Sequence, residues 1–329
     1  MSTTGGETGG AGDFRLRDLE PGLSTMRCAV LAGLRSSPKH LPSQYLYDAR
    51  GARLFERICE QPEYYLARTE AAIMEANMES IVDGIGPGAL LIEPGSGAGA
   101  KSRLLLEGLV RPSGYVPIDI SREQLVGLAR AVAARFPDVE VVPVCADFTD
   151  DPDLPAVAGP VRRRVVFLPG STIGNFEPEA AVEVLRDLRD LCGERGCVLI
   201  GVDLKKGREM VEPAYDDARG VSREFALNYL RRLNRELGAD FALEAFDYEA
   251  PYDARRGRVE MSLVSLRDQA ARVGGEQIRF ELGERVRTEW SYKYDLDQFR
   301  ALVERAGLLL ERVWTDPDQL FSVQLLRAP

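Results

Sequence analysis

The sequence predicts an α/β fold in which a Rossmann-like parallel sheet carries an inserted mixed α+β subdomain. From residue 89 onward, apolar runs of strand length alternate with segments of helical periodicity, a pattern typical of parallel strands joined by crossover helices. The rhythm stops after residue 205, and residues 242–293 alternate in strand fashion without helices between them. A helix and two strands then close the chain, so we expect the sheet to regain strands after the insertion.

Five strands and three helices are predicted in the first part of this sheet. The strands and their loops are "ALLIEPGSG", "GYVPIDIS", "VEVVPVCADF", "RRVVFLPGSTIGNF" and "GCVLIGVDL". The helices are "KSRLLLEGL", "SREQLVGLARAVAARFP" and "EPEAAVEVLRDLRDLC". Ser121 and Gln124 have the spacing of a capping box at the start of the second helix, and the acids that open the third suit its positive end.

The second part of the chain predicts a separate layer. Residues 206–241 are charged and helical, and "RVEMSLVSL", "EQIRFEL" and "RVRTEWSYKY" predict antiparallel strands. The chain ends with an amphipathic helix, "DLDQFRALVERAGL", and two strands joined by the turn "PDQ". We therefore expect a disordered tail over 1–13, a sheet domain over 20–68, 88–205 and 294–329, and a substrate-binding or lid subdomain over 69–87 and 206–293.

Composition and charge exclude several classes of function. Lys plus Arg number 42 against 52 Asp plus Glu, a net charge of -10, which would repel nucleic acid. No apolar run approaches the roughly 20 residues that cross a bilayer, and the start "MSTTGGETGGAGDF" lacks the features of a secretory signal. The five cysteines form no regular framework, which favours reduced thiols. We expect a cytoplasmic monomer with no membrane or nucleic-acid partner.

The single histidine, His40, limits the chemistry further. It lies in the polar stretch "SSPKHLPSQ", where we expect a solvated loop side chain. One histidine is too few for a metal site with several histidine ligands, and a histidine in a solvated loop does not suit a buried Ser/His/Asp arrangement. We expect no metal.

The stretch "LLIEPGSGAGAKSRLL" suits a nucleoside ligand at the end of the first strand. Gly95-x-Gly97-x-x-Ala100 fits a dinucleotide fingerprint, and Glu93-x-Gly95-x-Gly97-x-Gly99 fits a loop for S-adenosylmethionine (SAM). The spacing alone does not choose between them, and a tight turn without a ligand is a further reading. In either site, Asp119 at the end of the second strand would accept hydrogen bonds from ribose hydroxyls.

Three features favour SAM. Glu93 could orient the loop or a charged ligand tail, whereas a pyrophosphate would face it with like charge. Asp147 and Phe148, ending the third strand, suit the amino group and the ring face of adenine. The closing helix and two strands match the extra strands of class I SAM-dependent methyltransferases.

The loop after the fourth strand, "PGSTIGNF", faces the same crevice and is expected to touch the substrate. Asn175 offers a donor and an acceptor for a carboxylate or an amine, although asparagine before a helix is also a common cap. Tyr47 and the pair Tyr64 and Tyr65 fit either packing or ligand contact.

Several long motifs resemble one family, the histidine Nα-methyltransferases of ergothioneine biosynthesis. They are "YLYDARGARLFERICEQPEYYLARTE", "GSGAGAKSR", "FLPGSTIGNF", a segment from "EPAYDDARGVSREF" to "LGADF", and "RTEWSYKY". The resemblance runs from about residue 20 to the end. It implies a SAM-dependent enzyme that converts L-histidine in three rounds to its trimethyl betaine, hercynine, while SAM leaves as S-adenosylhomocysteine. It also implies that the inserted subdomain, with the N-terminal segment, closes over the amino acid.

The resemblance also implies roles for individual residues. SAM contacts fall on Gly95, Lys101, Asp119, Asp147 and Phe148, which join Glu93 and Gly97 of the glycine loop. On the substrate side the implied contacts are Asn175 and Tyr215 for the carboxylate, Glu289 and Ser291 for the imidazole, Tyr47, Tyr64 and the Gly170 backbone near the amino group, and Met261 lining the ring pocket.

The implied chemistry is an in-line displacement, for which the protein holds the nitrogen, the methyl group and the sulfur in line. Tyrosine hydroxyls or water take the proton of the amine. In the last round, Tyr47 is expected to orient the dimethylamine as a hydrogen-bond donor, and aromatic faces accommodate the quaternary cation.

The sequence departs from the family pattern in two places. Pro94 precedes the first glycine where leucine is expected, and "EWSYKY" carries bulkier residues than "EISCKF"-like versions. Trp290 should point away from Glu289 and Ser291, because neighbours on a strand face opposite sides. The alternative functions are an N-methyltransferase of the same fold acting on another aromatic amino acid, such as a tryptophan derivative, and a non-catalytic nucleoside-binding protein. A buried carboxylate without a second ring nitrogen to contact would be costly, so Glu289 favours imidazole.

Overall fold

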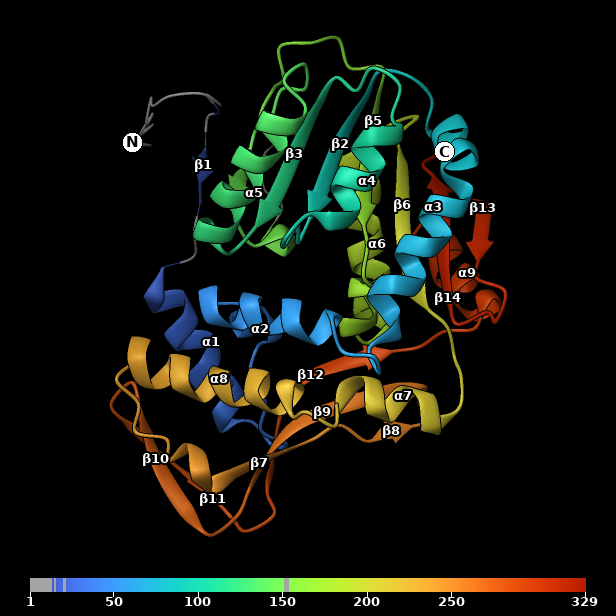
Figure 1. The fold of residues 1–329 in the computed structure, drawn as a ribbon. Helices are drawn as coiled ribbons and strands as arrows, with labels where there is room; N and C mark the ends of the chain where they lie inside the picture. The colour runs from blue at the N-terminus through green and yellow to red at the C-terminus, as the bar shows by residue number, and fades with distance from the viewer. Residues whose placement is uncertain (1–13, 15, 20–21, 151–153) are drawn as a thin grey trace.

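The structure is a computed structural model that describes residues 14, 16–19, 22–150 and 154–329 (Figure 1). The tail expected over residues 1–13 lies outside the described residues.

A large sheet forms the upper half of the molecule in Figure 1. Within the described residues it has eight strands, of which the first six in spatial order run parallel, while the last two are antiparallel to their neighbours. The predicted Rossmann-like class is confirmed. In order across the sheet the strands are β1 (Arg17–Asp18), β4 (Val144–Cys145), β3 (Gly114–Asp119), β2 (Ala89–Pro94), β5 (Arg163–Leu168), β6 (Cys197–Asp203), β14 (Phe321–Arg327) and β13 (Leu309–Thr315).

The third predicted strand is much shorter than expected. Only Val144 and Cys145 form β4, and Val141 makes an isolated bridge to Tyr115. Pro143 lies between them and has no N–H for the ladder, so the pairing is interrupted there.

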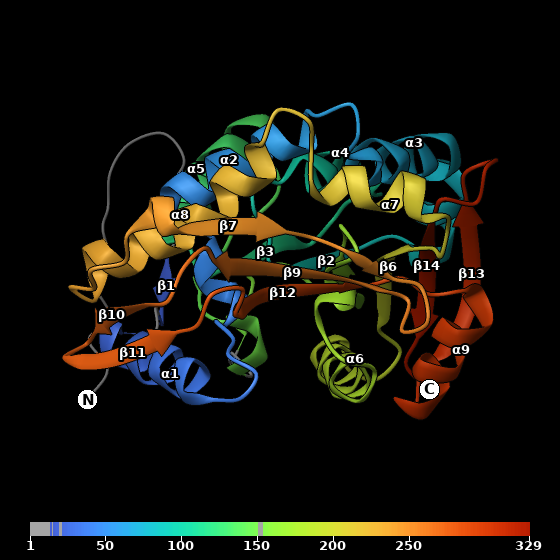
Figure 2. The ribbon, with the colours of Figure 1, turned by 90° about the horizontal axis from the view of Figure 1, so that it is seen from below.

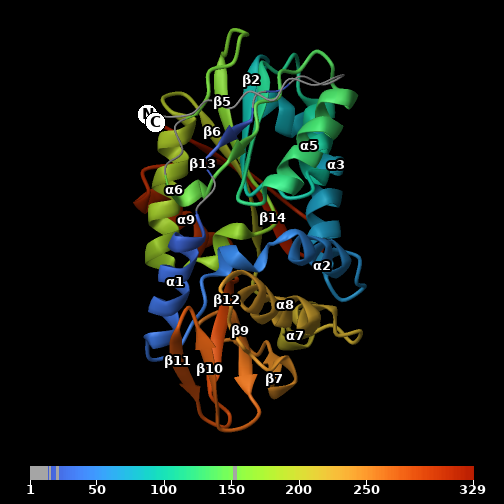
Figure 3. The same ribbon diagram turned by 90° about the vertical axis from the view of Figure 1, so that its left-hand side faces the viewer.

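Helices cover both faces of this sheet (Figure 3). Successive residues of β2 point to opposite faces, so Leu91 packs into one core and Ile92 into the other. The Leu91 face carries α3 (Tyr65–Ile85), α4 (Ala100–Gly108) and α5 (Arg122–Arg135), and the Ile92 face carries α6 (Pro178–Cys192) and α9 (Leu296–Arg305).

The predicted capping box at the start of α5 is wrong. Ser121 is the N-cap of α5, but its side chain makes no capping hydrogen bond. A capping box occurs instead at α9, where Asp295 accepts the N–H of Gln298 and the Gln298 side chain accepts the N–H of Asp295. The Ser121 N–H donates to Asp119, so the turn after β3 is held by the strand-end acid.

The inserted subdomain lies below the carboxyl ends of the parallel strands (Figures 1 and 2). Its antiparallel sheet has β9 between β12 and β7, with β8 also pairing with β9, and a separate hairpin is formed by β10 and β11. The strands are β7 (Phe246–Glu249), β8 (Tyr252–Asp253), β9 (Arg258–Ser265), β10 (Gln269–Val273), β11 (Glu276–Phe280) and β12 (Arg285–Tyr292). The remaining helices are α1 (Leu23–Arg35), α2 (Ala49–Cys59), α7 (Arg208–Tyr215) and α8 (Val221–Glu236), with short 3-10 turns η1 (Ser43–Leu46), η2 (Phe148–Asp150), η3 (Thr172–Asn175) and η4 (Leu243–Ala245).

The expected division of the chain differs from the packing in two segments. Residues 20–68 were expected in the sheet domain, yet α2 lies along α8, where Asp48 accepts hydrogen bonds from Asn228 and Arg235, each at 2.7 Å. Residues 69–87 were expected in the lid, yet α3 packs on the large sheet, where Arg312 and Trp314 of β13 donate to Ser80. Ile81 of α3 is buried in the same apolar cluster as Leu91 of β2.

Single-residue expectations are partly met. All five cysteines are free, as expected. His40 is half-buried rather than solvated, with Nδ1 at 3.0 Å from Ser36 Oγ, and burial lowers the pKa of its imidazole. No helix in the described part of the chain is long and apolar enough to cross a membrane.

Candidate active site

The glycine loop follows β2 and leaves open space above its backbone. Gly95, Gly97 and Gly99 have φ of +67°, +50° and +66°, values that residues with a side chain rarely adopt. A Cβ at Gly97 would meet nothing within 4 Å, and one at Gly95 would meet only Phe148, at 4.0 Å. A Cβ at Gly99 would lie 2.2 Å from Leu128, so this glycine lets α5 pack closely. The first two glycines therefore border free space, and the third serves packing.

Two carboxylates at strand ends frame that space. Asp119 accepts the N–H of Gly97 at 2.9 Å through one oxygen and the N–H of Ser121 at 2.8 Å through the other. Burial raises the pKa of Asp119 even though these bonds favour its charged form. Asp147, ending the β4 segment, accepts the N–H of Thr149 at 3.0 Å. Parallel strands end at the same edge, which brings these acids beside the glycine loop.

Glu93 lies beneath the loop and is 1% exposed. One of its oxygens accepts hydrogen bonds from Ser102 of α4 and from the hydroxyl of Tyr115 on β3. Burial raises the pKa of Glu93 to about 7. Of its two expected roles, these bonds fit the orientation of the loop.

A carboxylate that the sequence analysis missed joins the loop to the neighbouring strand end. Glu70 of α3 is fully buried and forms an ion pair with Lys101 of α4. It also accepts the N–H of Gly170, after β5, at 2.8 and 3.1 Å from its two oxygens. The Gly170 N–H is therefore occupied, and only its carbonyl is available to a ligand.

Asn175 and Glu289 are brought together from distant parts of the chain. Asn175 ends η3, and its Nδ2 donates to Oε1 of Glu289 on β12 at 2.8 Å. A Cβ at Gly174 would lie 2.7 Å from the backbone oxygen of Tyr292, so the missing side chain allows η3 to approach β12. Burial raises the pKa of Glu289 to about 8, with Lys293 acting in the opposite direction.

A hydroxyl pair lies on the same side of β12. Tyr215, at the end of α7, and Ser291 are hydrogen-bonded at 2.8 Å between their hydroxyl oxygens. Lys293 contacts both hydroxyls and also pairs with Asp203 at the end of β6. Neither Lys293 nor Asp203 was selected from the sequence. Asp203 carried the same signal as Asp119, because an acid ends each of these strands.

Tyr47 and Tyr64 belong to a group of aromatic side chains that pack against one another. Tyr47 packs edge-on against Phe55 and Phe225, with ring centroids 5.6 and 5.4 Å apart, and Tyr64 packs against Tyr215 at 6.1 Å. Burial raises the pKa of Tyr47 well above its usual value, and Glu289 adds to the effect. Its hydroxyl therefore stays protonated near neutral pH.

Met261 and Trp290 lie on the strands around Glu289. Met261 is the β9 partner of Glu289 in the ladder and is buried. Two arginines lie against the Trp290 ring, with the guanidinium carbons of Arg287 and Arg258 at 3.5 and 4.5 Å from its centroid. The bulk of Trp290 is thus engaged by these cations.

The predicted residues form two neighbouring groups. We call the first the loop half: Glu93, Gly95, Gly97, Lys101, Asp119, Asp147 and Phe148. We call the second the strand half: Tyr47, Tyr64, Gly170, Asn175, Tyr215, Met261, Glu289 and Ser291.

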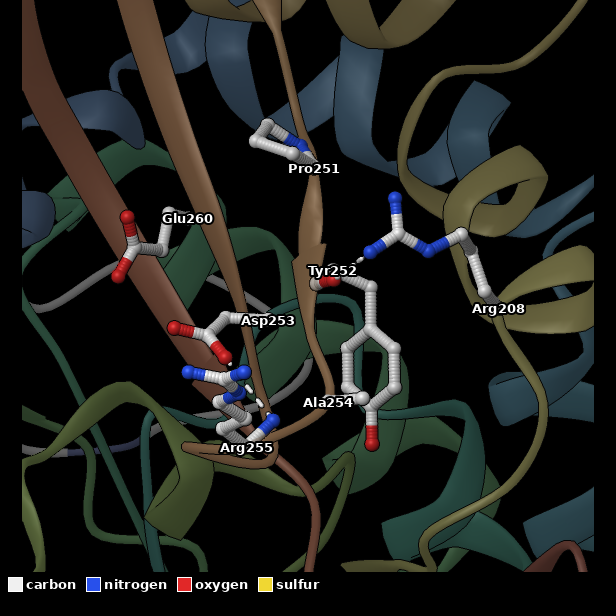
Figure 4. Close-up of a pocket in the computed structure, with 7 residues that line it drawn as sticks. All are labelled: Arg208, Pro251, Tyr252, Asp253, Ala254, Arg255 and Glu260. Atoms are coloured by element: carbon white, nitrogen blue, oxygen red, sulfur yellow. Dashed lines mark hydrogen bonds between the residues drawn. The ribbon is translucent and has the colours of Figure 1, made fainter.

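A separate hollow of about 440 Å³ contains none of these residues (Figure 4). Two of its charged side chains are already engaged, since Arg208 donates to the Tyr252 carbonyl at 3.0 Å and Asp253 accepts the N–H of Arg255 at 2.9 Å. We assign no ligand to it. The lining residues are Arg208, Pro251, Tyr252, Asp253, Ala254, Arg255 and Glu260.

Comparisons with known proteins agree with the geometry. Residues 26–328 match the sequence model of a family described as histidine-specific, SAM-dependent methyltransferases. The histidine N-alpha-methyltransferase of Mycolicibacterium smegmatis is 38% identical over 91% of this chain and 94% of its own length. That of Mycobacterium tuberculosis is 35% identical over 93% of this chain and 96% of its own length. Ergothioneine biosynthesis protein 1 of Neurospora crassa is 34% identical over 85% of this chain and 32% of its own length.

Proposed function

The chain belongs to the family of histidine-specific, SAM-dependent methyltransferases, and on this premise we propose that it methylates the α-amino nitrogen of L-histidine. Three rounds convert histidine to hercynine, the first step of ergothioneine biosynthesis. The observation that supports this best is the hydrogen bond between Asn175 and Glu289 beside the hydroxyl pair of Tyr215 and Ser291. This arrangement combines a carboxylate, an amide and two hydroxyls, which suits a substrate with one carboxylate and two ring nitrogens.

The loop half fits SAM. Space is open above Gly97, and among the described residues the buried Ser96 Oγ has no hydrogen-bond partner. Asp119 has oxygen lone pairs left for ribose hydroxyls after its two backbone bonds. Asp147 would accept from the adenine amino group, and the Phe148 ring would lie on the adenine face. When bound, SAM supplies a methyl group on a positively charged sulfur.

The polar tail of SAM would meet the other end of the loop half. The Gly95 backbone can approach the ligand closely, since little lies above it. Lys101 would receive the methionine carboxylate, and Glu70, already paired with Lys101, holds that ammonium in place. Glu93 supports the loop from below through Ser102.

The strand half would hold histidine by both ends. Asn175 and Tyr215 donate to the substrate carboxylate, and Glu289 and Ser291 contact the two ring nitrogens. Met261 lines the apolar side of the ring. Asn175 bonds only Oε1 of Glu289, so a ring without a second nitrogen would leave the other oxygen of this buried carboxyl group without a ligand contact, which disfavours other aromatic amino acids.

Tyr47, Tyr64 and Gly170 would surround the α-amino group. Because the Tyr47 hydroxyl stays protonated, it cannot act as a phenolate base. Its oxygen can accept an amine N–H and turn the nitrogen lone pair toward the methyl group, and the Gly170 carbonyl can accept another. Water then takes the proton. Alignment of this kind supplies about 7 to 11 kcal/mol in well-oriented reactions.

The test is mass spectrometry of the purified protein with SAM and an equimolar mixture of the twenty amino acids. We expect mono-, di- and trimethylhistidine in succession with equivalent S-adenosylhomocysteine. Methylation of a different amino acid would contradict the assignment of histidine as the substrate but would still support SAM as the methyl donor. The monomeric state and cytoplasmic location remain predictions, which light scattering and cell fractionation would check.

A further inference from the structure

Lys293 is a buried cation beneath the strand half with three hydrogen-bond partners. Its ammonium nitrogen lies 2.5 Å from the Tyr215 hydroxyl, 2.7 Å from Ser291 Oγ and 2.8 Å from Asp203 Oδ2. The side chains of Lys293 and Asp203 are both 0% exposed. An ammonium has three donors and no acceptor, so every N–H of Lys293 is used.

Lys293 keeps its charge. Burial alone would lower the pKa of Lys293, but the Asp203 carboxylate and Tyr215 raise it above its usual value. Lys206 shares the same carboxylate at 2.5 Å, and burial with the nearby charge of Lys293 brings the pKa of Lys206 down to about 8. When one of the two lysines loses a proton, it is therefore Lys206.

The fixed donors of Lys293 limit what the two hydroxyls can offer. Each hydroxyl has one hydrogen and two lone pairs, and Lys293 occupies one lone pair on each. The bond between Tyr215 and Ser291 uses one hydrogen and one further lone pair. One outward hydrogen and one outward lone pair remain, and they belong to different residues. If Tyr215 points its hydrogen outward, Ser291 can only accept.

We propose that Lys293 is a positioning residue that couples recognition of the substrate carboxylate to the protonation of the imidazole ring. This inference rests on the proposed function. A carboxylate accepts the outward hydrogen of Tyr215, which turns the Ser291 hydrogen toward Tyr215 and leaves Ser291 an acceptor. The ring nitrogen that faces Ser291 must then carry hydrogen. The other ring nitrogen meets Glu289, and this pair shares the one proton that protonated Glu289 brings to a neutral ring.

The test is nitrogen NMR of ring-labelled ligands bound to the protein with S-adenosylhomocysteine. The nitrogen that faces Ser291 is identified as the one whose signal shifts in Ser291→Ala. With histidine we expect hydrogen on that nitrogen. With histamine, which lacks the carboxylate, we expect the hydrogen on that nitrogen to be partly lost, because the hydroxyl bond is free to reverse.

Variants separate this coupling from stability. Lys293→Met should abolish the difference between histidine and histamine and weaken histidine binding at least about tenfold, with less effect on histamine. Lys206→Met is the matched control, because it removes a cation from the same Asp203 without touching either hydroxyl. Lys206→Met should retain the difference in ring protonation between bound histidine and bound histamine. Tyr215→Phe leaves Ser291 with a free hydrogen and a free lone pair, so the hydrogen on the facing nitrogen should be partly lost even with histidine. This variant preserves the test if Lys293→Met does not fold.

Two results would overturn the inference. One is a bare nitrogen opposite Ser291 in the wild-type histidine complex, and the other is an unchanged hydrogen pattern in Tyr215→Phe or in folded Lys293→Met. Failure of the proposed function looks different, since the wild type would then neither bind nor methylate histidine.

Discussion

Asp119 in the loop half and the polar groups of the strand half are satisfied in different ways. In the loop half, Asp119 is held by backbone N–H groups that lie within about one βα unit of it. In the strand half, Asn175, Tyr215 and Glu289 come from three separate segments, and side chains bond to side chains. A backbone cradle tolerates change in the surrounding side chains, whereas a side-chain network fails when one member is lost. The two halves should therefore respond differently to substitution.

The largest effect is expected in the strand half. Glu289→Gln removes the carboxylate that faces the imidazole, and we expect kcat/KM for histidine to fall about a hundredfold. The dissociation constant of SAM should stay within about twofold, because the hydrogen-bond partner of Glu289 is Asn175, a member of the strand half. Steady-state kinetics and calorimetry measure the two. Glu260→Gln, on the neighbouring strand, is the control, and an equal loss there would remove the special role of Glu289.

The loop half is tested by Asp119→Asn. The amide retains one acceptor oxygen, so it can hold either the loop or a ribose hydroxyl but serves both poorly. We expect the dissociation constant of SAM to rise about thirtyfold, measured by calorimetry. Histidine binding in the presence of saturating S-adenosylhomocysteine should change little. A comparable loss of histidine affinity would mean that the halves are not separate.

Tyr47→Phe tests the amine end of the strand half. The last round uses a tertiary amine with no N–H, so the hydroxyl is most needed for orientation there. We expect dimethylhistidine to accumulate and the third round to slow about tenfold, as followed by single-turnover mass spectrometry. Tyr45→Phe, at a buried tyrosine two residues earlier in the chain, is the control. Unchanged rates in every round would remove Tyr47 from the mechanism.

The pH dependence of ligand binding gives a smaller effect with a definite sign. Burial raises the pKa of Glu289 to about 8, so the free site holds its proton below that pH and loses it above. Because the Glu289 and imidazole pair needs one proton, affinity is present below pH 8 and lost as the pH rises through it. We expect imidazolepropionate, which has no amine to titrate, to bind about fivefold more weakly at pH 9 than at pH 8.

The control for this profile is Glu289→Gln, which should bind weakly and without the change above pH 8. A wild-type profile that is flat from pH 7 to pH 9 would contradict the assignment of the proton to Glu289.

The smallest effect concerns stability. Asp48 caps α2 through the Gly51 N–H and ties α2 to α8 through Asn228 and Arg235. Asp48→Ala should lower the free energy of unfolding by about 1 to 2 kcal/mol, measured in urea. SAM affinity should be unaffected, since α2 packs along α8. Asp297→Ala, at an exposed position, is the control and should change stability by less than about 0.5 kcal/mol.

The contrast between the halves also explains what could be predicted from the sequence. The glycine loop and Asp119 could be predicted from the sequence because strand, turn and helix follow one another directly in the chain. Lys293 and Glu70 were not accessible from local pattern, because their partners lie far away in the chain. The packing partners of α2 and α3 were not accessible for the same reason. Helical periodicity identifies an apolar face but not the surface that the face covers.

Glu70 has a consequence for anyone who would exchange parts between related enzymes. Its carboxylate holds Lys101 on one side and the Gly170 backbone on the other, and it comes from a helix that packs along the large sheet. If a substrate pocket is moved from one enzyme into another without α3, Glu70 comes from the recipient while its partners come from the donor. Such a chimera should include α3 of the donor, or keep a carboxylate at the position of Glu70 that bonds both partners, before its substrate specificity is measured.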